Sequence, residues 1–386
     1  MGGTLVLTVA GTARSDQAVS SYASWSASPL PVDDAALVPV ERDALARCGR
    51  GEAGLRAVAR ALLARKLSGG SLPELDGIAR EQRAAGEPHP WPRAWSAHAR
   101  SLESAEARAS TGALLDAWLG TGAVSLRRCG VASGVAPDGS QTLVVVTVEA
   151  FADLAPLPTR ARTGQWLTLE AHLRAPATGA SVVVLDAGGA PRTVPSWIEG
   201  SVVRARFAPE RPGELDLQVV ADLASGPRPV VEATVFVDEQ PTRGIEDSSA
   251  PGERDGASDA TPDDERLARM ITAARASVGL APLARDSRLD RLALAHASRM
   301  ASARELAHDA GDGDPLDRLH AAGFEPRNAG ENVAHASSLP LAHRALWASP
   351  SHRLNLLGRG YDRMGLGVVR DARGDFWVVE TFASAL

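Results

Sequence analysis

The chain has 386 residues and a formal net charge of -6 at neutral pH. Its length is enough for roughly two to four domains of about 100–150 residues, each with its own core. The acidic balance argues against a nucleic-acid partner, because a phosphate-binding face needs a basic excess. No run of about 18 apolar residues occurs, so we expect no membrane-spanning segment.

The two cysteines, Cys48 and Cys129, both lie in the first third of the chain. They can form one disulfide if the protein is exported, or remain two buried free thiols. Residues 1–10 contain a short apolar run with no basic residue before it, which is a poor match to a secretory signal. Either the protein is not exported by that route, or Met1 is not the natural start.

Residues 1–155 mix helical and strand patterns, which predicts an α+β domain. Leu55, Val58 and Leu62 keep the spacing of one face of a helix. The runs 128–131 and 143–148 flank Asp138-Gly139 and predict a β-hairpin.

Residues 159–238 consist of short runs in which apolar and polar side chains alternate, as in half-buried strands. Two of these runs place Leu215, Leu217 and Val219, and then Val231 and Val235, on single faces. Turns rich in Gly and Pro separate the runs. About five to seven such strands predict an antiparallel β-sandwich of immunoglobulin-like type. Because no polar cluster in it suggests catalysis, we expect this domain to act as a spacer or a binding module.

Residues 239–264 are dominated by Pro, Gly, Ser and acidic residues, and Ile245 is their only large apolar side chain. Such a segment cannot bury enough surface to order itself, so the composition predicts a flexible acidic linker.

Residues 265–386 show the clearest helical and strand signals. Leu267, Met270 and Ile271 begin an apolar stripe, and Asp286 or Ser287 can cap a second helix. Shorter helices follow, and the last runs predict a closing hairpin. Helices beside a small antiparallel sheet indicate an α+β sandwich.

His308 and His352 differ from other histidines of this region because each stands at the edge of a predicted element. His308 precedes a Gly- and Asp-rich turn, and His352 lies in the first turn of a helix for which Ser349 is the expected cap. Two converging imidazoles can bind a divalent ion, or one can act as a general base, since imidazole titrates near about 6.5. Glu331 can orient either ring, which makes these three the candidate catalytic residues. His296 lies on an apolar helix face and is predicted to be a packed core residue.

The order of these residues resembles a known family. The chain contains, in order, the motifs Leu306-x-His308, Gly330-Glu331-Asn332-Val333-Ala334, Trp347-x-Ser349-Pro350-x-His352-Arg353-x-Asn355 and Met364-Gly365-Leu366-Gly367. These motifs resemble those of the CAP superfamily of cysteine-rich secretory proteins, antigen 5 and pathogenesis-related 1 proteins, and most of all its bacterial, SCP-like extracellular branch. The resemblance covers residues 265–386.

The resemblance implies an α-β-α sandwich whose central cleft holds His308, Glu331 and His352. It implies that His308 and His352 bind zinc or another divalent ion, and that the protein is extracellular or attached to the cell envelope. The other motif residues are expected to support the cleft: Asn332, Trp347, Ser349, Arg353 and Asn355.

The chain departs from the family pattern after Trp347. Many members carry a second acidic residue a few positions after the corresponding aromatic, whereas here Ala348, Ser349 and Pro350 follow. This departure weakens any mechanism that needs two carboxylates.

Part of the pattern also occurs in residues 1–155. Trp118, Arg128-x-Gly130 and the run 148–152 echo Trp347, Arg363-x-Gly365 and the run 379–383. The echo predicts a degenerate second copy of the CAP fold, without a site because Gly-Glu-Asn and Ser-Pro-x-His-Arg-x-Asn have no counterpart there. The alternative is an unrelated helical domain with a hairpin.

Two main functions follow for the C-terminal residues. One is a binding module whose cleft takes a divalent ion and a small lipid or peptide, or a cell-envelope component. The other is a metal-assisted or general-base hydrolase acting on peptide or cell-envelope substrates. The missing second carboxylate favours binding. A structural protein with a relic site is the third alternative, and the sequence specifies neither the ligand nor the oligomeric state.

Overall fold

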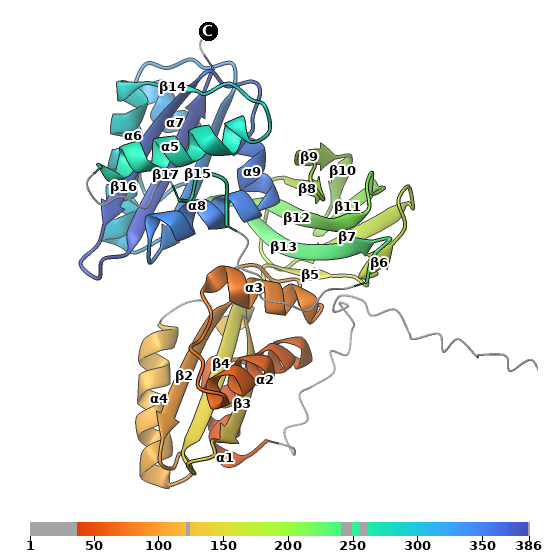
Figure 1. The fold of residues 1–386 in the computed structure, drawn as a ribbon, viewed down its shortest axis with the longest axis vertical. Helices are drawn as coiled ribbons and strands as arrows, with labels where there is room; N and C mark the ends of the chain where they lie inside the picture. The colour runs from red at the N-terminus through yellow and green to blue at the C-terminus, as the bar shows by residue number, and fades with distance from the viewer. Residues whose placement is uncertain (1–36, 121–123, 241–248, 255–260, 385–386) are drawn as a thin grey trace, which may run out of the picture.

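The computed structural model describes residues 37–120, 124–240, 249–254 and 261–384. These residues form an N-terminal α+β domain, a β-sandwich and a C-terminal α+β domain, with the sandwich beside the junction of the other two (Figure 1). The predicted fold class is confirmed. The segment 1–10, in which we sought an export signal, lies outside the described residues.

A four-stranded sheet with helices on both faces forms the N-terminal domain. Its strand order is β1-β3-β4-β2, with β1 parallel to β3 and the other pairs antiparallel. Strand β4 is buried on both faces, because Val144 and Val146 pack with α2 while Leu143 and Val145 pack with α1 and α4. The elements are α1 (Pro39–Cys48), β1 (Arg50–Gly51), α2 (Ala53–Leu67), α3 (Leu75–Ala84), β2 (Arg93–Ala99), α4 (Ala105–Leu119), the 3-10 helix η2 (Val124–Leu126), β3 (Arg127–Val135) and β4 (Gln141–Glu149).

A disulfide links the two cysteines of this domain. Cys48 at the end of α1 is bonded to Cys129 in β3, with their Cα atoms 6.2 Å apart. Of the two alternatives that the sequence left open, the structure therefore contains the disulfide.

The middle domain is a sandwich of two sheets with strand orders β10-β11-β7-β5 and β6-β13-β12-β8-β9. The faces predicted to be apolar, including Leu215, Leu217 and Val231, form its core. Its first strand begins at Ala152, before the predicted start at residue 159. The strands are β5 (Ala152–Leu154), β6 (Arg160–Ala161), β7 (Leu167–Leu173), β8 (Ala180–Asp186), β9 (Arg192–Val194), β10 (Ser196–Glu199), β11 (Val202–Phe207), β12 (Gly213–Leu223) and β13 (Gly226–Val237).

The C-terminal domain is a three-layer sandwich. Its sheet has the order β14-β16-β17-β15, with α6 against one face and α5, α8 and α9 against the other. The elements are α5 (Asp263–Ala276), β14 (Ala284–Arg285), α6 (Ser287–Ala303), α7 (Pro315–Ala321), β15 (Ala329–Ala336), α8 (Leu339–Ala348), α9 (Pro350–Leu356), β16 (Arg363–Arg370) and β17 (Phe376–Ala383).

The two α+β domains share their sheet topology. In each, a short first strand runs parallel to the next strand in the sheet, and the remaining pairs are antiparallel. In each, a helix also crosses a glycine closely: a Cβ added to Gly130 would lie 2.1 Å from the backbone of Leu55, and one added to Gly365 would lie 2.2 Å from that of Leu289. These features support the prediction of a second copy, and common origin remains a prediction.

Residues 249–254 of the predicted linker contact the C-terminal domain, which corrects the prediction of a flexible tether for these residues. Within 249–254, Ala250 is buried, the carbonyl of Pro251 lies 3.0 Å from His343 Nε2, and Glu253 is paired with Arg344 of α8. The composition of the segment did not indicate these contacts, because the groups that hold it belong to α8 of the C-terminal domain. The helix α5 then starts at Asp263, inside the predicted linker.

None of the described helices is both long and apolar enough to cross a membrane.

The close contact at Gly365 can be tested by Gly365→Ala. The added methyl group meets the backbone of α6 rather than a flexible side chain, so we expect a loss of about 2–3 kcal/mol in the free energy of unfolding of the C-terminal domain. Hydrogen exchange of β16 and β17 measures this loss. The control is Gly374→Ala, where no described atom lies within 4 Å of an added Cβ and only the positive φ of 88° opposes alanine, at a cost of about 1 kcal/mol. Equal losses in the two variants would contradict the close-packing explanation.

Candidate functional site

The site is organised by β15, which is the edge strand of the C-terminal sheet. Successive side chains of a strand point to opposite faces, so adjacent residues of the Gly-Glu-Asn motif diverge. Glu331 contacts the loop after α6 and the helix α7, whereas Asn332 contacts α9 on the other side. Groups from both layers can therefore meet around this edge.

Glu331 is a buried carboxylate with both oxygens engaged. Its Oε1 lies 2.9 Å from His308 Nδ1, and its Oε2 accepts a hydrogen bond from Arg318 Nη2 at 2.6 Å. Burial raises the pKa of Glu331, but the hydrogen bond from His308 and the charges of His308 and Arg318 outweigh burial and hold the pKa below its usual range. Glu331 is therefore ionised at neutral pH and orients the His308 ring.

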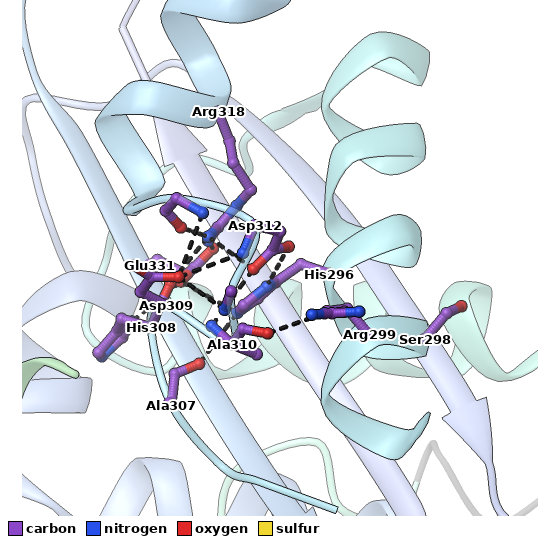
Figure 2. Close-up of polar contacts among 12 residues, drawn as sticks. His296, Ser298, Arg299, Ala307, His308, Asp309, Ala310, Asp312, Arg318 and Glu331 are labelled. Atoms are coloured by element: carbon purple, nitrogen blue, oxygen red, sulfur yellow. Dashed lines mark hydrogen bonds and ion pairs between the residues drawn. The ribbon is translucent and has the colours of Figure 1, made fainter. Parts of the chain in front are cut away.

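The loop that carries His308 is braced from several sides, as Figure 2 shows. His296 lies 2.8 Å from Asp312 Oδ2 through Nδ1 and 3.0 Å from the carbonyl of Ala307 through Nε2. Arg318 donates to the carbonyl of His308 at 2.8 Å. His296 is fully buried, as predicted, and it also fixes the position of the candidate site loop.

His352 lies in the first turn of α9 and is anchored through the same ring atom as His308. Its Nδ1 is 2.7 Å from Ser349 Oγ, and its carbonyl accepts a hydrogen bond from Asn332 Nδ2 at 3.1 Å. Burial, together with the nearby charge of His308, lowers the pKa of His352 to about 3. The ring is therefore neutral at physiological pH.

The two histidines line one small cavity. It has a volume of about 20 Å³, and its wall also contains Trp91, Arg228 and Val333. A cavity of about 10–15 Å³ or more can hold one water molecule, so this one fits a water or a single ion. Each ring has its Nδ1 engaged, and within the described part of the chain neither Nε2 has a hydrogen-bond partner. The Nε2 atoms are the groups that the rings can offer to a ligand.

A larger cavity of about 490 Å³ lies beside the small one and shares His352 and Trp91 with it. All three domains line it, with Trp91 from the N-terminal domain, Gln218 from the sandwich and Leu346 from the C-terminal domain. Cavities of about 300–1,000 Å³ are typical of small-molecule sites. The candidate site is thus an interdomain feature, which the sequence did not indicate.

The residues predicted to support the cleft surround it. Asn332 is fully buried, and its Oδ1 accepts from Asn355 Nδ2 at 3.0 Å, while the same Asn355 nitrogen lies 3.1 Å from the carbonyl of Glu331. Arg353 stacks over the Trp347 ring at 4.2 Å and donates to the Trp347 carbonyl. These contacts tie α8 and α9 to the edge strand.

Ser349 occupies the predicted N-cap position of α9, but its side chain makes no capping hydrogen bond within the described chain, which corrects that part of the prediction. Its hydroxyl instead contacts His352 and Gln218 of the sandwich.

A second carboxylate belongs to this network and was missed from the sequence. Glu380 in β17 is fully buried, and its Oε2 accepts from Asn332 Nδ2 at 2.9 Å. Its Oε1 has no hydrogen-bond partner within the described residues. Burial raises the pKa of Glu380 to about 7, against the opposing hydrogen bond from Asn332. A glutamate within a mostly apolar strand was the available signal.

The three candidate residues do not form a tight ligand cluster by themselves. Among the described residues, the group of three whose ligand atoms lie within 4.8 Å of one another is His335, Asp371 and Asp375. It contains none of the three candidate residues, although His335 also lines the larger cavity. In this group, Asp371 Oδ1 accepts from the backbone N–H groups of Arg373 and Asp375, and its Oδ2 accepts from Trp377. These bonds explain that cluster as part of the β16–β17 turn.

Residues 268–382 match the family model described as the cysteine-rich secretory protein family, CAP. These residues form a CAP domain. A comparison with curated proteins finds no match to the chain.

Several solved structures are similar to the chain. An outer surface protein of Borrelia burgdorferi is 22% identical over 33% of this chain and 97% of that protein, with a TM-score of 0.32. An extracellular SCP-domain protein of Bacillus anthracis is 14% identical over 61% of this chain and 86% of that protein, with a TM-score of 0.29. A fibronectin(III)-like module of Clostridium thermocellum CbhA is 19% identical over 20% of this chain and 82% of that module, with a TM-score of 0.16.

The raised pKa of Glu380 predicts a pH dependence of CAP-domain stability. Unfolding returns the carboxyl from a pKa of about 7 to its ordinary pKa of 4.5, so the folded state favours the protonated form. The contribution of the Glu380 carboxyl to the free energy of unfolding is greatest below pH 4.5. It is lost as the pH rises through about 7, a change of about 3 kcal/mol. Relative to the wild type, Glu380→Gln should therefore gain stability over this range. The measurement is the difference in unfolding free energy between the two proteins from pH 4 to 8, and a flat difference would show that Glu380 does not titrate in this way.

Proposed function

We propose that the CAP domain is a binding module in which His308 and His352 hold a divalent ion, such as zinc, and a small lipid or peptide occupies the adjoining cavity. The observation that carries the proposal is that both rings are anchored through Nδ1 and line one ion-sized cavity beside the larger one.

The residues fit a divalent ion. Metal-binding histidines commonly use one ring nitrogen for the ion and donate through the other to a fixed partner, which is the pattern of His308 with Glu331. His352 has this pattern when the Ser349 hydroxyl accepts from its Nδ1–H. Arg228 also lines the small cavity, but Glu149 neutralises it at 3.1 Å. Both oxygens of Glu331 are engaged, so the ion would complete its shell with water or ligand. When bound, such an ion polarises a water or carbonyl oxygen.

The larger cavity suits a small lipid or an apolar peptide segment. Much of its wall is apolar, with Trp91, Leu119, Val148, Val333 and Leu346 among the lining residues. Polar groups at the His352 end, including Gln218 and Ser349, can orient a head group or a peptide bond.

The compartment proposed for this function is extracellular or the cell envelope. Two features support it: the match to the cysteine-rich secretory protein family and the Cys48–Cys129 disulfide, since disulfides persist mainly in oxidising compartments.

The second candidate function is hydrolysis of a peptide or cell-envelope substrate. It is favoured by the His308–Glu331 pair, in which an ionised carboxylate orients an imidazole whose Nε2 is left to act as a base. Ser349 and His352 also form a pair, but Ser349 contacts Nδ1, and no described residue orients Nε2. Turnover of casein or peptidoglycan fragments that disappears in Glu331→Gln would favour this function over binding alone.

Zinc titration of the full chain tests the metal part of the proposal. His308→Ala and His352→Ala each remove one of two protein ligands, so each should weaken zinc binding at least about tenfold by calorimetry. His320→Ala, on the exposed side of α7, is the matched control, and Asp375→Asn removes the separate cluster at the β16–β17 turn. Unchanged affinity in both cleft variants would eliminate this metal site.

Filling the larger cavity tests the ligand part. Ala345→Trp places a large side chain on the cavity wall and should weaken binding of a fluorescent long-chain fatty acid at least about tenfold. Leu114→Trp is the control, because Leu114 is 62% exposed on α4 and lies outside this cavity. If both variants bind the fatty acid as the wild type does, the cavity is not its site.

A further inference from the structure

The β-sandwich supplies a polar side chain to the CAP site. Gln218 of β12 is buried, with 1% of its surface exposed. Its Nε2 donates to Glu232 Oε1 at 2.6 Å and to Ser349 Oγ at 2.9 Å, and its Oε1 accepts from the backbone N–H of Ser351 at 2.8 Å. One amide therefore joins the sandwich to the start of α9.

The partners of this amide define its orientation. The Glu232 carboxylate can only accept a hydrogen bond, and the backbone N–H of Ser351 can only donate one. Turning the amide over would place its oxygen against the Glu232 carboxylate and its NH₂ group against the Ser351 N–H. The nitrogen of Gln218 thus faces Glu232, and the oxygen faces α9.

Gln218 takes over the capping function that Ser349 would otherwise have. An N-cap serine normally accepts a hydrogen bond from the backbone N–H two or three residues later, which here would be Ser351 or His352. The oxygen of Gln218 accepts the Ser351 N–H instead. The Ser349 hydroxyl is therefore available to the His352 ring, 2.7 Å away.

The same contacts favour one ring nitrogen of neutral His352 as the position of the proton. Gln218 Nε2 donates to Ser349 Oγ at 2.9 Å. The single proton of this hydroxyl can go to Gln218 Oε1 at 3.2 Å or to His352 Nδ1 at 2.7 Å, and the shorter contact favours His352 Nδ1. The ring proton then lies on Nε2. In neutral His308 the arrangement is reversed, because Nδ1–H donates to Glu331 and Nε2 keeps its lone pair.

We propose that Gln218 is a positioning residue of the CAP site that holds His352 as an Nε2–H donor, so that the cleft presents one donor and one acceptor and binds a hydroxyl group. A hydroxyl of a ligand, or a water, can accept from His352 Nε2–H and donate to His308 Nε2. A divalent ion requires a lone pair on both atoms, and His352 supplies one only when the Ser349 hydroxyl turns to Gln218 Oε1. This inference rests on the proposed function, because it takes this cleft as the ligand site. The contact of Gln218 with α9 then favours a ligand that carries a hydroxyl group.

The variant Gln218→Glu tests the inference with almost no change of shape. It replaces the N–H group that faces Ser349 by an oxygen, and the new carboxyl and Glu232 can share one proton. Ser349 must then donate toward residue 218 and accept from His352 Nδ1–H, which leaves a lone pair on Nε2. We expect the His352 tautomer to reverse and the zinc affinity to rise at least about tenfold.

The measurement is long-range ¹H–¹⁵N correlation NMR of the full chain at neutral pH, with the His352 signals assigned by their loss in His352→Ala. The wild type should show the Nε2–H tautomer for His352. Ser349→Ala is the matched control: it removes the hydroxyl without removing a capping bond, and it should give a mixture of tautomers in a folded protein.

A wild-type His352 with its proton on Nδ1 would overturn the inference. So would a folded Gln218→Glu protein in which the tautomer is unchanged and only the melting temperature falls, because a purely structural role predicts that outcome. If neither the wild type nor Gln218→Glu binds zinc, but the tautomer of His352 reverses as expected, the metal part of the proposed function fails and the role of Gln218 stands.

Discussion

The alternation of side chains along the edge strand β15 is the constraint on which the CAP site depends. Glu331 and Asn332 are adjacent in sequence, yet they hold different layers of the domain, the His308 loop and α7 on one side and α9 on the other. Beside an interior strand, the neighbouring strands of the sheet would separate these two layers. At the edge the two layers meet, and two histidines from distant parts of the chain line one cavity.

Three buried polar side chains around this edge find hydrogen-bond partners across element and domain boundaries. Glu331, Asn332 and Gln218 are all buried, and burial of such groups costs about 1–3 kcal/mol for each missing hydrogen bond. Their partners belong to α7, α9, β13 and β17. The network therefore stabilises one placement of the sandwich against α9, and this placement also encloses the larger cavity.

The N-terminal domain shows how the same architecture can exist without the site. It keeps the strand order and the close helix contact at Gly130. Its own edge strand, β2, contributes Arg93 to the wall of the interdomain cavity instead of a Gly-Glu-Asn motif. In this chain the N-terminal domain thus helps to enclose the cavity beside the candidate site of the other domain.

Much of the CAP domain could be predicted because its signals are local. The helical stripe of Leu267, Met270 and Ile271, the cap at Asp286 and the Gly-Glu-Asn motif each occupy a few consecutive residues, and they identified the fold and the trio His308, Glu331 and His352. The disulfide remained one of two alternatives until the distance between Cys48 and Cys129 was known.

The sequence by itself determined the elements, the family resemblance and the candidate residues, since these depend on spacing along the chain. The tertiary structure decided which other groups those residues contact. Gln218 stands in an ordinary alternating strand and Trp91 in another domain, so nothing local distinguishes them as parts of the site. Glu380 stands out as a glutamate in a mostly apolar strand, but its sequence does not show which groups it contacts. Hydrogen bonding and desolvation depend on which groups meet in space, and those meetings are set by the packing of whole domains.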